Sequence, residues 1–126
     1  MASKQVNAKQ KQWMKDITEW AQHNLYVLYG DDYNDSYIPI QRHHVLGRSA
    51  KQNKVSIGHW FILPVPFELH DPNVNHEFHV GHCKNSFTDK YGNQRDLFAD
   101  MYVTMRAQGY EVPSEDVLNA IMDTRA

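Results

Sequence analysis

Two apolar segments that resemble β-strands enclose a long polar segment in the middle of this 126-residue chain, and this arrangement restricts its fold most strongly. The first segment is YIPIQRHHVL (37–46), and the second is HWFILPVP (59–66), which its two prolines curtail. Between them lies GRSAKQNKVSIG, a polar and basic segment bounded by Gly47 and Gly58. This order predicts a β-hairpin with a long connection.

The segment before the hairpin carries helical spacing. Trp13, Ile17 and Trp20 recur at intervals of three and four residues, which predicts an amphipathic helix over residues 7–23. The apolar run LYVLYG (25–30) that follows predicts a short buried strand.

The segment after the hairpin is also expected to be mainly helical. PFELHD (66–71) predicts a short helix or turn, and two longer helices are predicted on either side of Gly92, in NSFTDKY and NQRDLFADMYVTMRAQGY. Ser114 is a helix-capping residue followed by two acids, so it predicts the start of a last helix. The fold class expected from this order is α+β.

The length of the chain favours a single domain over residues 1–126. We expect an N-terminal helix and short strand over 1–36, a core over 37–82, and a helical part over 83–126. No apolar run is long enough to cross a membrane, so we expect no membrane partner and a cytoplasmic location. Cys83 is the single cysteine, which excludes a disulfide framework and a paired-cysteine zinc site.

Histidine is concentrated in one part of the chain, because seven of the eight histidines lie between His43 and His82. A hairpin would bring His43 and His44 near His59, and His70 could return to the same corner from a short helix. Three or four imidazoles without cysteine suit zinc or another divalent transition metal. An unligated neighbour could instead take a proton from an attacking water. The simpler alternative is one buried and one exposed histidine.

Basic residues form a strip within the same region. No acid occurs between Asp35 and Glu68, whereas four basic residues do: Arg42, Arg48, Lys51 and Lys54. Such a strip is compatible with contacts to phosphates of a nucleic acid. An ordinary solvated loop would have the same composition.

The segment QRHHVLGRS…GHWFILPVPFELHD resembles the ββα-metal core of the HNH nucleases. With the downstream FTDKYGNQRDLF, it is similar to the Ref family of phage recombination-enhancement nucleases, which depend on RecA. The resemblance covers about residues 40–100 and implies a small ββα-metal core with a His-rich loop, flanked by helices. It implies a metal-dependent DNA endonuclease, with DNA and the RecA filament as expected partners and the host cytoplasm as its location if a phage encodes it.

The resemblance also implies roles for individual residues. His43 and His70 match metal ligands, His44 matches the general base, and His59 falls where many members have Asn and would orient that base or polarise the phosphate. We favour His79 as a third ligand over His76 and His82. The divalent ion would be zinc, magnesium or manganese, and the DNA backbone would be held by four basic residues: Arg42, Arg48, Lys51 and Lys54.

Two features separate this chain from related metal proteins. Many HNH proteins bind a structural zinc through paired cysteines, which this chain lacks. The segment HEFH (76–79) is one residue short of the HExxH zinc-protease helix, so a protease of that type is not expected. The surplus of histidines keeps an alternative open, in which a zinc ion with a closed coordination sphere stabilises a non-catalytic DNA- or protein-binding module.

Overall fold

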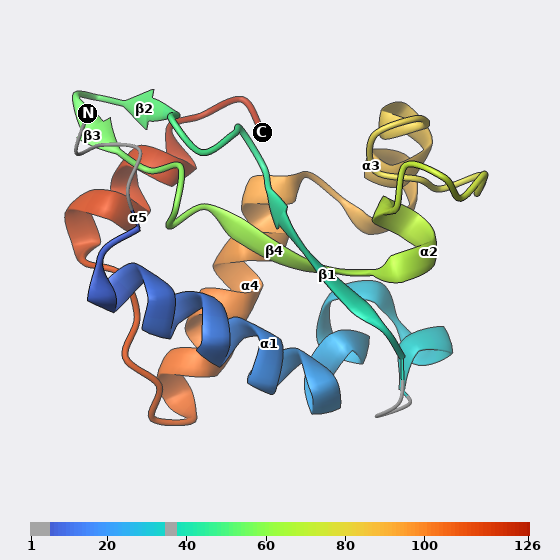
Figure 1. The fold of residues 1–126 in the computed structure, drawn as a ribbon, viewed down its shortest axis with the longest axis horizontal. Coiled ribbons are helices and arrows are strands. Elements are labelled where there is room, and N and C mark those ends of the chain that lie inside the picture. Colours follow the sequence, from blue (N-terminus) through green and yellow to red (C-terminus); the bar gives the residue numbers. More distant parts are fainter. Residues whose placement is uncertain (1–5, 35–37) are drawn as a thin grey trace.

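The two strands that flank the basic segment pair with each other in the computed structural model, which describes residues 6–34 and 38–126. Strand β1 (Ile40–His44) runs antiparallel to β4 (Ile62–Pro66), with His43 opposite Leu63 and His44 opposite Ile62. Across the described residues the fold is α+β, with five α-helices and two small antiparallel sheets (Figure 1). The predicted fold class and hairpin are confirmed at this level.

The prolines of β4 fit the strand because of the hydrogen-bonding register. Val45 N donates to Phe61 O, and Phe67 N donates to Pro39 O, so the ladder bonds fall on odd-numbered residues. Pro64 and Pro66 therefore occupy positions whose missing N–H groups would not have faced β1. All five residues of β4 are nevertheless buried, because helices cover its outer side.

The basic connection contains a second, smaller hairpin that the sequence did not predict. Strands β2 (Lys51–Gln52) and β3 (Val55–Ser56) pair through a tight turn. The two turn residues between the strands both have positive φ, 53° and 64°, as a two-residue hairpin turn with right-handed twist requires. The turn is attached to the C-terminal region, because Asn53 Nδ2 donates to Asp123 Oδ2 at 2.6 Å.

Helix α1 (Ala8–Tyr29) is longer than predicted, and the strand expected over residues 25–30 is wrong. Leu25, Leu28 and Tyr29 are buried and continue the apolar stripe of the helix. A short apolar run has no period that distinguishes a strand from a buried helical turn, which explains the error. The helix ends at Gly30, whose φ of 89° suits a residue without a side chain.

The start of α1 is fixed by a reciprocal cap. Gln10 N donates to Asn7 Oδ1 at 2.8 Å, and Asn7 N donates to Gln10 Oε1 at 3.0 Å. At the other end, a 3-10 helix, η2 (Asp31–Tyr33), follows Gly30. Tyr37, the first residue of the predicted first strand, lies outside the described residues.

The remaining helices agree with the predicted pattern. They are α2 (Phe67–His70), α3 (Lys84–Tyr91), α4 (Gln94–Ala107) and α5 (Glu115–Met122). Figure 1 shows α5 beside the β2–β3 hairpin at one end of the molecule and α2 and α3 at the other end. Helices α1 and α4 both contact β4, and Phe98 of α4 packs edge-on against Trp13 and Phe61 in the core between them. The end of β1 therefore lies over a rigid base of buried aromatic side chains.

No helix in the described part of the chain combines the length and the apolar character that crossing a membrane requires.

Candidate metal and acid–base site

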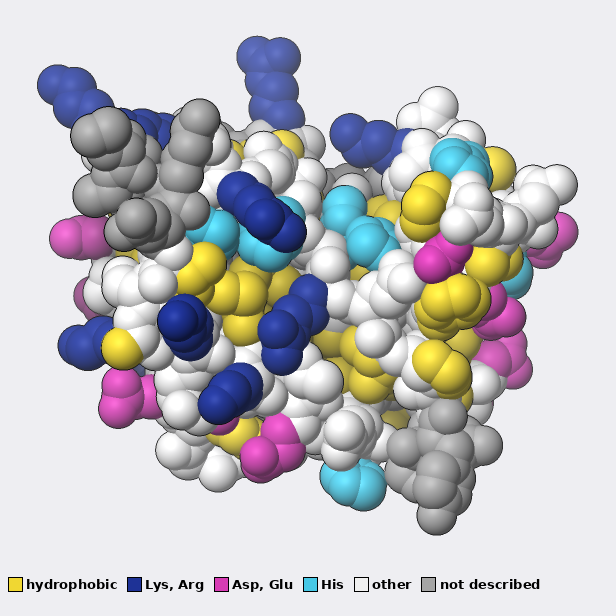
Figure 2. Space-filling model, viewed as in Figure 1, with side chains coloured by type: hydrophobic (Ala, Val, Ile, Leu, Met, Phe, Trp, Pro, Cys, Tyr) yellow, Lys and Arg dark blue, Asp and Glu magenta, His cyan; other side chains and the backbone are white. Residues whose placement is uncertain are grey.

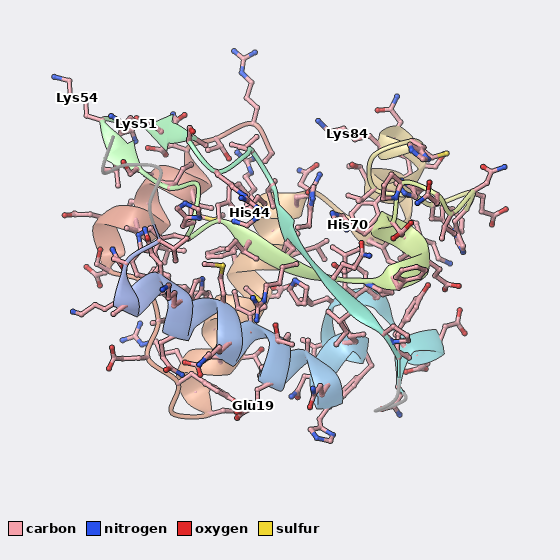
Figure 3. All side chains as sticks on the ribbon, in the orientation of Figure 1. Glu19, His44, Lys51, Lys54, His70 and Lys84 are labelled. Atoms are coloured by element: carbon pink, nitrogen blue, oxygen red, sulfur yellow. The ribbon has the colours of Figure 1, made fainter. Side chains whose placement is uncertain are left out.

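The end of β1 carries two histidines whose rings lie in separate pairs. Successive side chains of a strand point to opposite sides, so His43 and His44 diverge. The His43 ring meets the His70 ring edge-on, with 5.0 Å between their centroids and 63° between their planes. The His44 ring meets the His59 ring at 5.4 Å and 84°. Figure 3 shows His44 and His70 on either side of the end of β1.

Each ring of the His43–His70 pair has a glutamine partner. His43 Nε2 lies 2.9 Å from Gln94 Oε1, and Gln94 is the first residue of α4 and only 5% exposed. His70 Nδ1 is hydrogen-bonded to Gln41 Oε1. Helix α2 places His70 here, as the last residue of this four-residue helix. Each ring keeps one nitrogen that these bonds do not use.

The rings of His44 and His59 are in edge-on contact. His59 is only 4% exposed, and His44 Nε2 is a buried nitrogen with no hydrogen-bond partner within the described chain. A buried polar atom without a partner is costly, so it marks a place where a ligand or water could bind.

A close backbone approach fixes the position of His59. A side chain at the preceding Gly58 would place its Cβ 2.1 Å from the carbonyl oxygen of Arg48, so the two segments of the connection touch at this glycine. Gly58 N and Ile57 N both donate to Ala50 O, at 3.1 and 2.9 Å. Glycine is thus the residue that lets the connection fold back and present His59 to His44.

The electrostatic environment keeps the imidazoles of His43, His44 and His70 neutral at pH 7. Burial, followed by repulsion from His70, lowers the pKa of His43 to about 4, although the bond to Gln94 opposes the shift. Burial also lowers the pKa of His44, with smaller contributions from His59 and Arg48. The pKa of His70 is lowered by burial and then by His79. Neutral imidazole is the form that binds metals and accepts protons.

His79, which we favoured as the third ligand, is occupied by a structural role. Its Nδ1 accepts from the backbone N–H groups of Gly81 and His82 at 3.0 and 2.9 Å, and its Nε2 donates to Asp71 O at 2.9 Å. With both ring nitrogens engaged and 2% exposure, His79 organises the loop between α2 and α3. The geometry therefore disfavours a ligand role for His79.

The other two candidates for a third ligand have contacts of their own outside the His43–His70 pair. His82 stacks on His79 with 3.9 Å between ring centroids. His76 Nδ1 accepts from Phe78 N at 3.0 Å, and its Nε2 lies 4.0 Å from Glu68 Oε1. Over residues 6–34 and 38–126, no group of three His, Cys, Asp or Glu side chains is close enough to hold a metal ion.

The four predicted DNA-binding residues divide into two groups. Lys51, Lys54 and Arg48 are exposed on the basic connection, and Figure 3 shows Lys51 and Lys54 at the tip of the β2–β3 hairpin. Arg42 lies on β1, where its Nε donates to Thr18 Oγ1 of α1 at 2.9 Å. Figure 2 shows histidine side chains reaching the surface on this face of the molecule, with Lys and Arg side chains nearby.

Sequence reasoning missed three polar residues around the histidine pair. Gln94 and Gln41 bond to the rings, and Asp71 Oδ2 accepts from Gln41 Nε2 at 3.0 Å. The period-2 pattern of β1 could have placed Gln41 on the same side as His43, because the two residues are two apart. Gln94 had no such signal, because it lies 51 residues from His43.

No protein-family model, curated protein or solved structure matches this chain. The grounds for a functional proposal are therefore its own residues and their geometry.

Proposed function

We propose that this protein is a metal-dependent DNA endonuclease of the HNH class. The observation that carries the proposal is the arrangement of the two histidine pairs, His43–His70 and His44–His59, at the end of a β-hairpin that runs directly into a short helix. In this proposal β1, β4 and α2 form the ββα-metal core. The order of the elements and the spacing of the histidines both support this assignment.

His43 and His70 would hold the divalent ion, which is zinc, magnesium or manganese. Two neutral imidazoles are a fitting but incomplete donor set, so the remaining coordination positions are left to water and to phosphate oxygens. A bound ion would supply positive charge to the scissile phosphate and to the departing oxygen. Because DNA completes the coordination, we expect metal and DNA to increase each other's affinity.

His44 would act as the general base through its buried Nε2, which has no other hydrogen-bond partner in the described structure. It takes a proton from water while the water oxygen forms a bond to phosphorus and the bond from phosphorus to the 3′-oxygen breaks. His59, packed edge-on against His44, would hold the ring of the base in place. The lowered pKa of His44 keeps it unprotonated, and therefore able to accept, at neutral pH.

The basic side chains near the histidines would bind the DNA backbone. Arg48, Lys51 and Lys54 extend from the connection, and Arg42 lies on β1 itself. Contacts of this kind give affinity without reading the base sequence, and they weaken as salt concentration rises.

The test is a cleavage assay on supercoiled plasmid and on single-stranded circular DNA, with magnesium, manganese or zinc. We expect nicking or cutting that requires a divalent ion and is lost in His44→Ala. Cutting by His44→Ala at the wild-type rate would contradict the assignment of the base. The same lanes with RecA and ATP test whether the RecA filament is a partner, because a Ref-like enzyme would cut only in their presence.

The same experiment addresses the alternative of a zinc-stabilised binding module. That alternative predicts a large drop in melting temperature on chelation, with no cleavage under any metal. The engaged ring nitrogens of His79 count against it, because they leave fewer imidazoles to close a coordination sphere.

A further inference from the structure

We infer that Gln94 and Gln41 are positioning residues, which fix His43 and His70 in opposite tautomers so that each ring presents one bare nitrogen to the same ion. The inference rests on the proposed function for the identity of that ion. Gln41 of β1 and Gln94 of α4 are neither proposed ligands nor proposed bases, and they come from two separate elements of the fold.

Gln94 determines the tautomer of His43. The amide oxygen of Gln94 is an acceptor only, so the ring nitrogen that faces it at 2.9 Å must carry the proton. His43 is therefore protonated at Nε2, and its Nδ1 keeps the lone pair that a metal needs. Gln94 is 5% exposed at the first position of α4, a helix that packs against β4, so its side chain has little freedom to turn away.

Gln41 determines the tautomer of His70, with Asp71 as its anchor. Asp71 Oδ2 accepts from the amide nitrogen of Gln41 at 3.0 Å, which leaves the amide oxygen facing His70 Nδ1. Asp71 is itself oriented by Asn73 N, which donates to its Oδ1 at 2.9 Å. His70 is thus protonated at Nδ1 and keeps a lone pair on Nε2, the reverse of the arrangement in His43.

A shared ion would bind the ring nitrogens that the two glutamines leave bare. The two rings meet edge-on with 5.0 Å between their centroids. Because Nε2 of His43 and Nδ1 of His70 face glutamine oxygens, an ion about 2.0–2.1 Å from one nitrogen of each ring would bind Nδ1 of His43 and Nε2 of His70. If either ring adopted its other tautomer, an N–H group would occupy the coordinating position and binding would cost a tautomeric rearrangement. Partners that hold metal-bound histidines in this way commonly contribute about 10- to 100-fold in metal affinity.

The first test reads the tautomers directly in the wild-type, metal-free protein. Long-range nitrogen–proton NMR correlations of the imidazole rings at pH 7.5 distinguish a proton on Nδ1 from one on Nε2. We expect His43 protonated at Nε2 and His70 protonated at Nδ1. The same tautomer in both rings, or an equal mixture in either, would overturn the inference without any variant.

The second test measures zinc affinity by isothermal titration calorimetry, with zinc chloride as the probe. Gln94→Met and Gln41→Met keep the volume of the side chain and remove the acceptor, so each should weaken zinc binding about 10- to 100-fold. Gln94→Glu and Gln41→Glu keep an acceptor oxygen and should restore most of the affinity. Gln12→Met, on an exposed part of α1, is the matched control and should bind like the wild type.

The outcomes separate this inference from the proposed function. Wild-type protein that binds zinc and cuts DNA, with both methionine variants binding zinc within twofold of it, would overturn only the positioning roles. Wild-type protein that binds no divalent ion would instead overturn the proposed function, and the inference with it. If Gln94→Met does not fold, as judged by circular dichroism, Gln41→Met on the hairpin strand decides the result together with the tautomers of the wild type.

Discussion

The two histidine pairs flank the same strand end, yet the surroundings of His43 and His44 differ. In the His43–His70 pair each ring is hydrogen-bonded to a glutamine, and one of these glutamines is anchored by Asp71. In the His44–His59 pair the rings are packed, and the buried Nε2 of His44 has no hydrogen-bond partner in the part of the chain that the structure describes. A ligand must keep one tautomer, whereas a base must exchange its proton in every catalytic cycle.

This difference fits the different roles that we propose for His43 and His44, which are neighbours on β1. Strand geometry sends His43 and His44 to opposite sides, and each side meets a different set of partners. A glutamine oxygen faces one nitrogen of each proposed ligand, His43 and His70. Nε2 of the proposed base, His44, has no hydrogen-bond partner among the described residues.

The largest expected effect separates the two pairs by activity. His44→Ala should lower the DNA cleavage rate by about 10²- to 10⁴-fold, because it removes the proposed general base. Zinc affinity should stay within about twofold of the wild type, since His44 belongs to the other pair; calorimetry with zinc chloride measures it. Loss of zinc binding together with cleavage would show that the two pairs form one site and that the contrast is wrong.

The reverse experiment concerns the proposed ligands. Saturating zinc at about 100 times its dissociation constant should stabilise the wild-type protein by about 2.7 kcal/mol, because the ion binds the folded state. His70→Ala should remove most of that gain, whereas His82→Ala, in a histidine stacked on His79, should keep it. Thermal unfolding with and without zinc measures both. An equal gain in all three proteins would exclude His70 as a ligand.

A smaller effect is expected from the glycine that positions His59. Gly58→Ala should lower the free energy of unfolding by roughly 1–3 kcal/mol, because the new Cβ would overlap the carbonyl of Arg48. Urea unfolding measures the change, and Ser49→Ala, exposed in the same connection, is the control. Cleavage should fall in Gly58→Ala while zinc affinity does not, since only the His44–His59 pair depends on this contact. Unchanged stability would show that the connection can move apart at no cost.

The basic hairpin should affect affinity and leave both pairs intact. In the double variant Lys51→Gln, Lys54→Gln, the slope of the logarithm of the DNA association constant against the logarithm of salt concentration should become less negative. The change should be about 0.9 for each DNA phosphate that the variant no longer neutralises. Lys90→Gln, on α3 at the other end of the molecule, is the control. Fluorescence anisotropy with a labelled duplex over several salt concentrations measures the slope, and an unchanged slope would place the DNA elsewhere.

A separate prediction is a pH dependence of stability in the metal-free protein. The pKa of His43 is lowered from about 6.5 to about 4 in the folded state, so between these values the unfolded chain binds more protons. The contribution of His43 to stability is therefore complete above pH 6.5 and is lost as the pH falls towards 4. Urea unfolding of the wild type and His43→Gln should give free energies that converge on acidification. If the two free energies of unfolding differed by the same amount at every pH, the lowered pKa of His43 would be contradicted.

Much of the fold could be predicted from local patterns. The apolar segments around the basic connection predicted β1 and β4. The segment NQRDLFADMYVTMRAQGY predicted α4, in which Leu97, Met101 and Met105 are buried. The error over residues 25–30 arose because a six-residue apolar run fits two kinds of element, and only packing decides between them. There, the hydroxyl of Tyr29 donates to Pro64 O at 2.7 Å, a contact that the helix makes possible.

The sequence by itself determined that histidines would gather near the end of a hairpin, because strand pairing brings residues 15 or 16 apart together. The partners of each ring, however, depend on the folded core. His79 Nδ1 accepts hydrogen bonds from backbone N–H groups of its own loop, which disfavours the expected role as a metal ligand. His43, in contrast, is hydrogen-bonded to Gln94, which lies 51 residues further along the chain. The physical reason is that the role of an imidazole depends on which of its nitrogens is engaged, and the partners that engage them come from elements that only the folded core brings together.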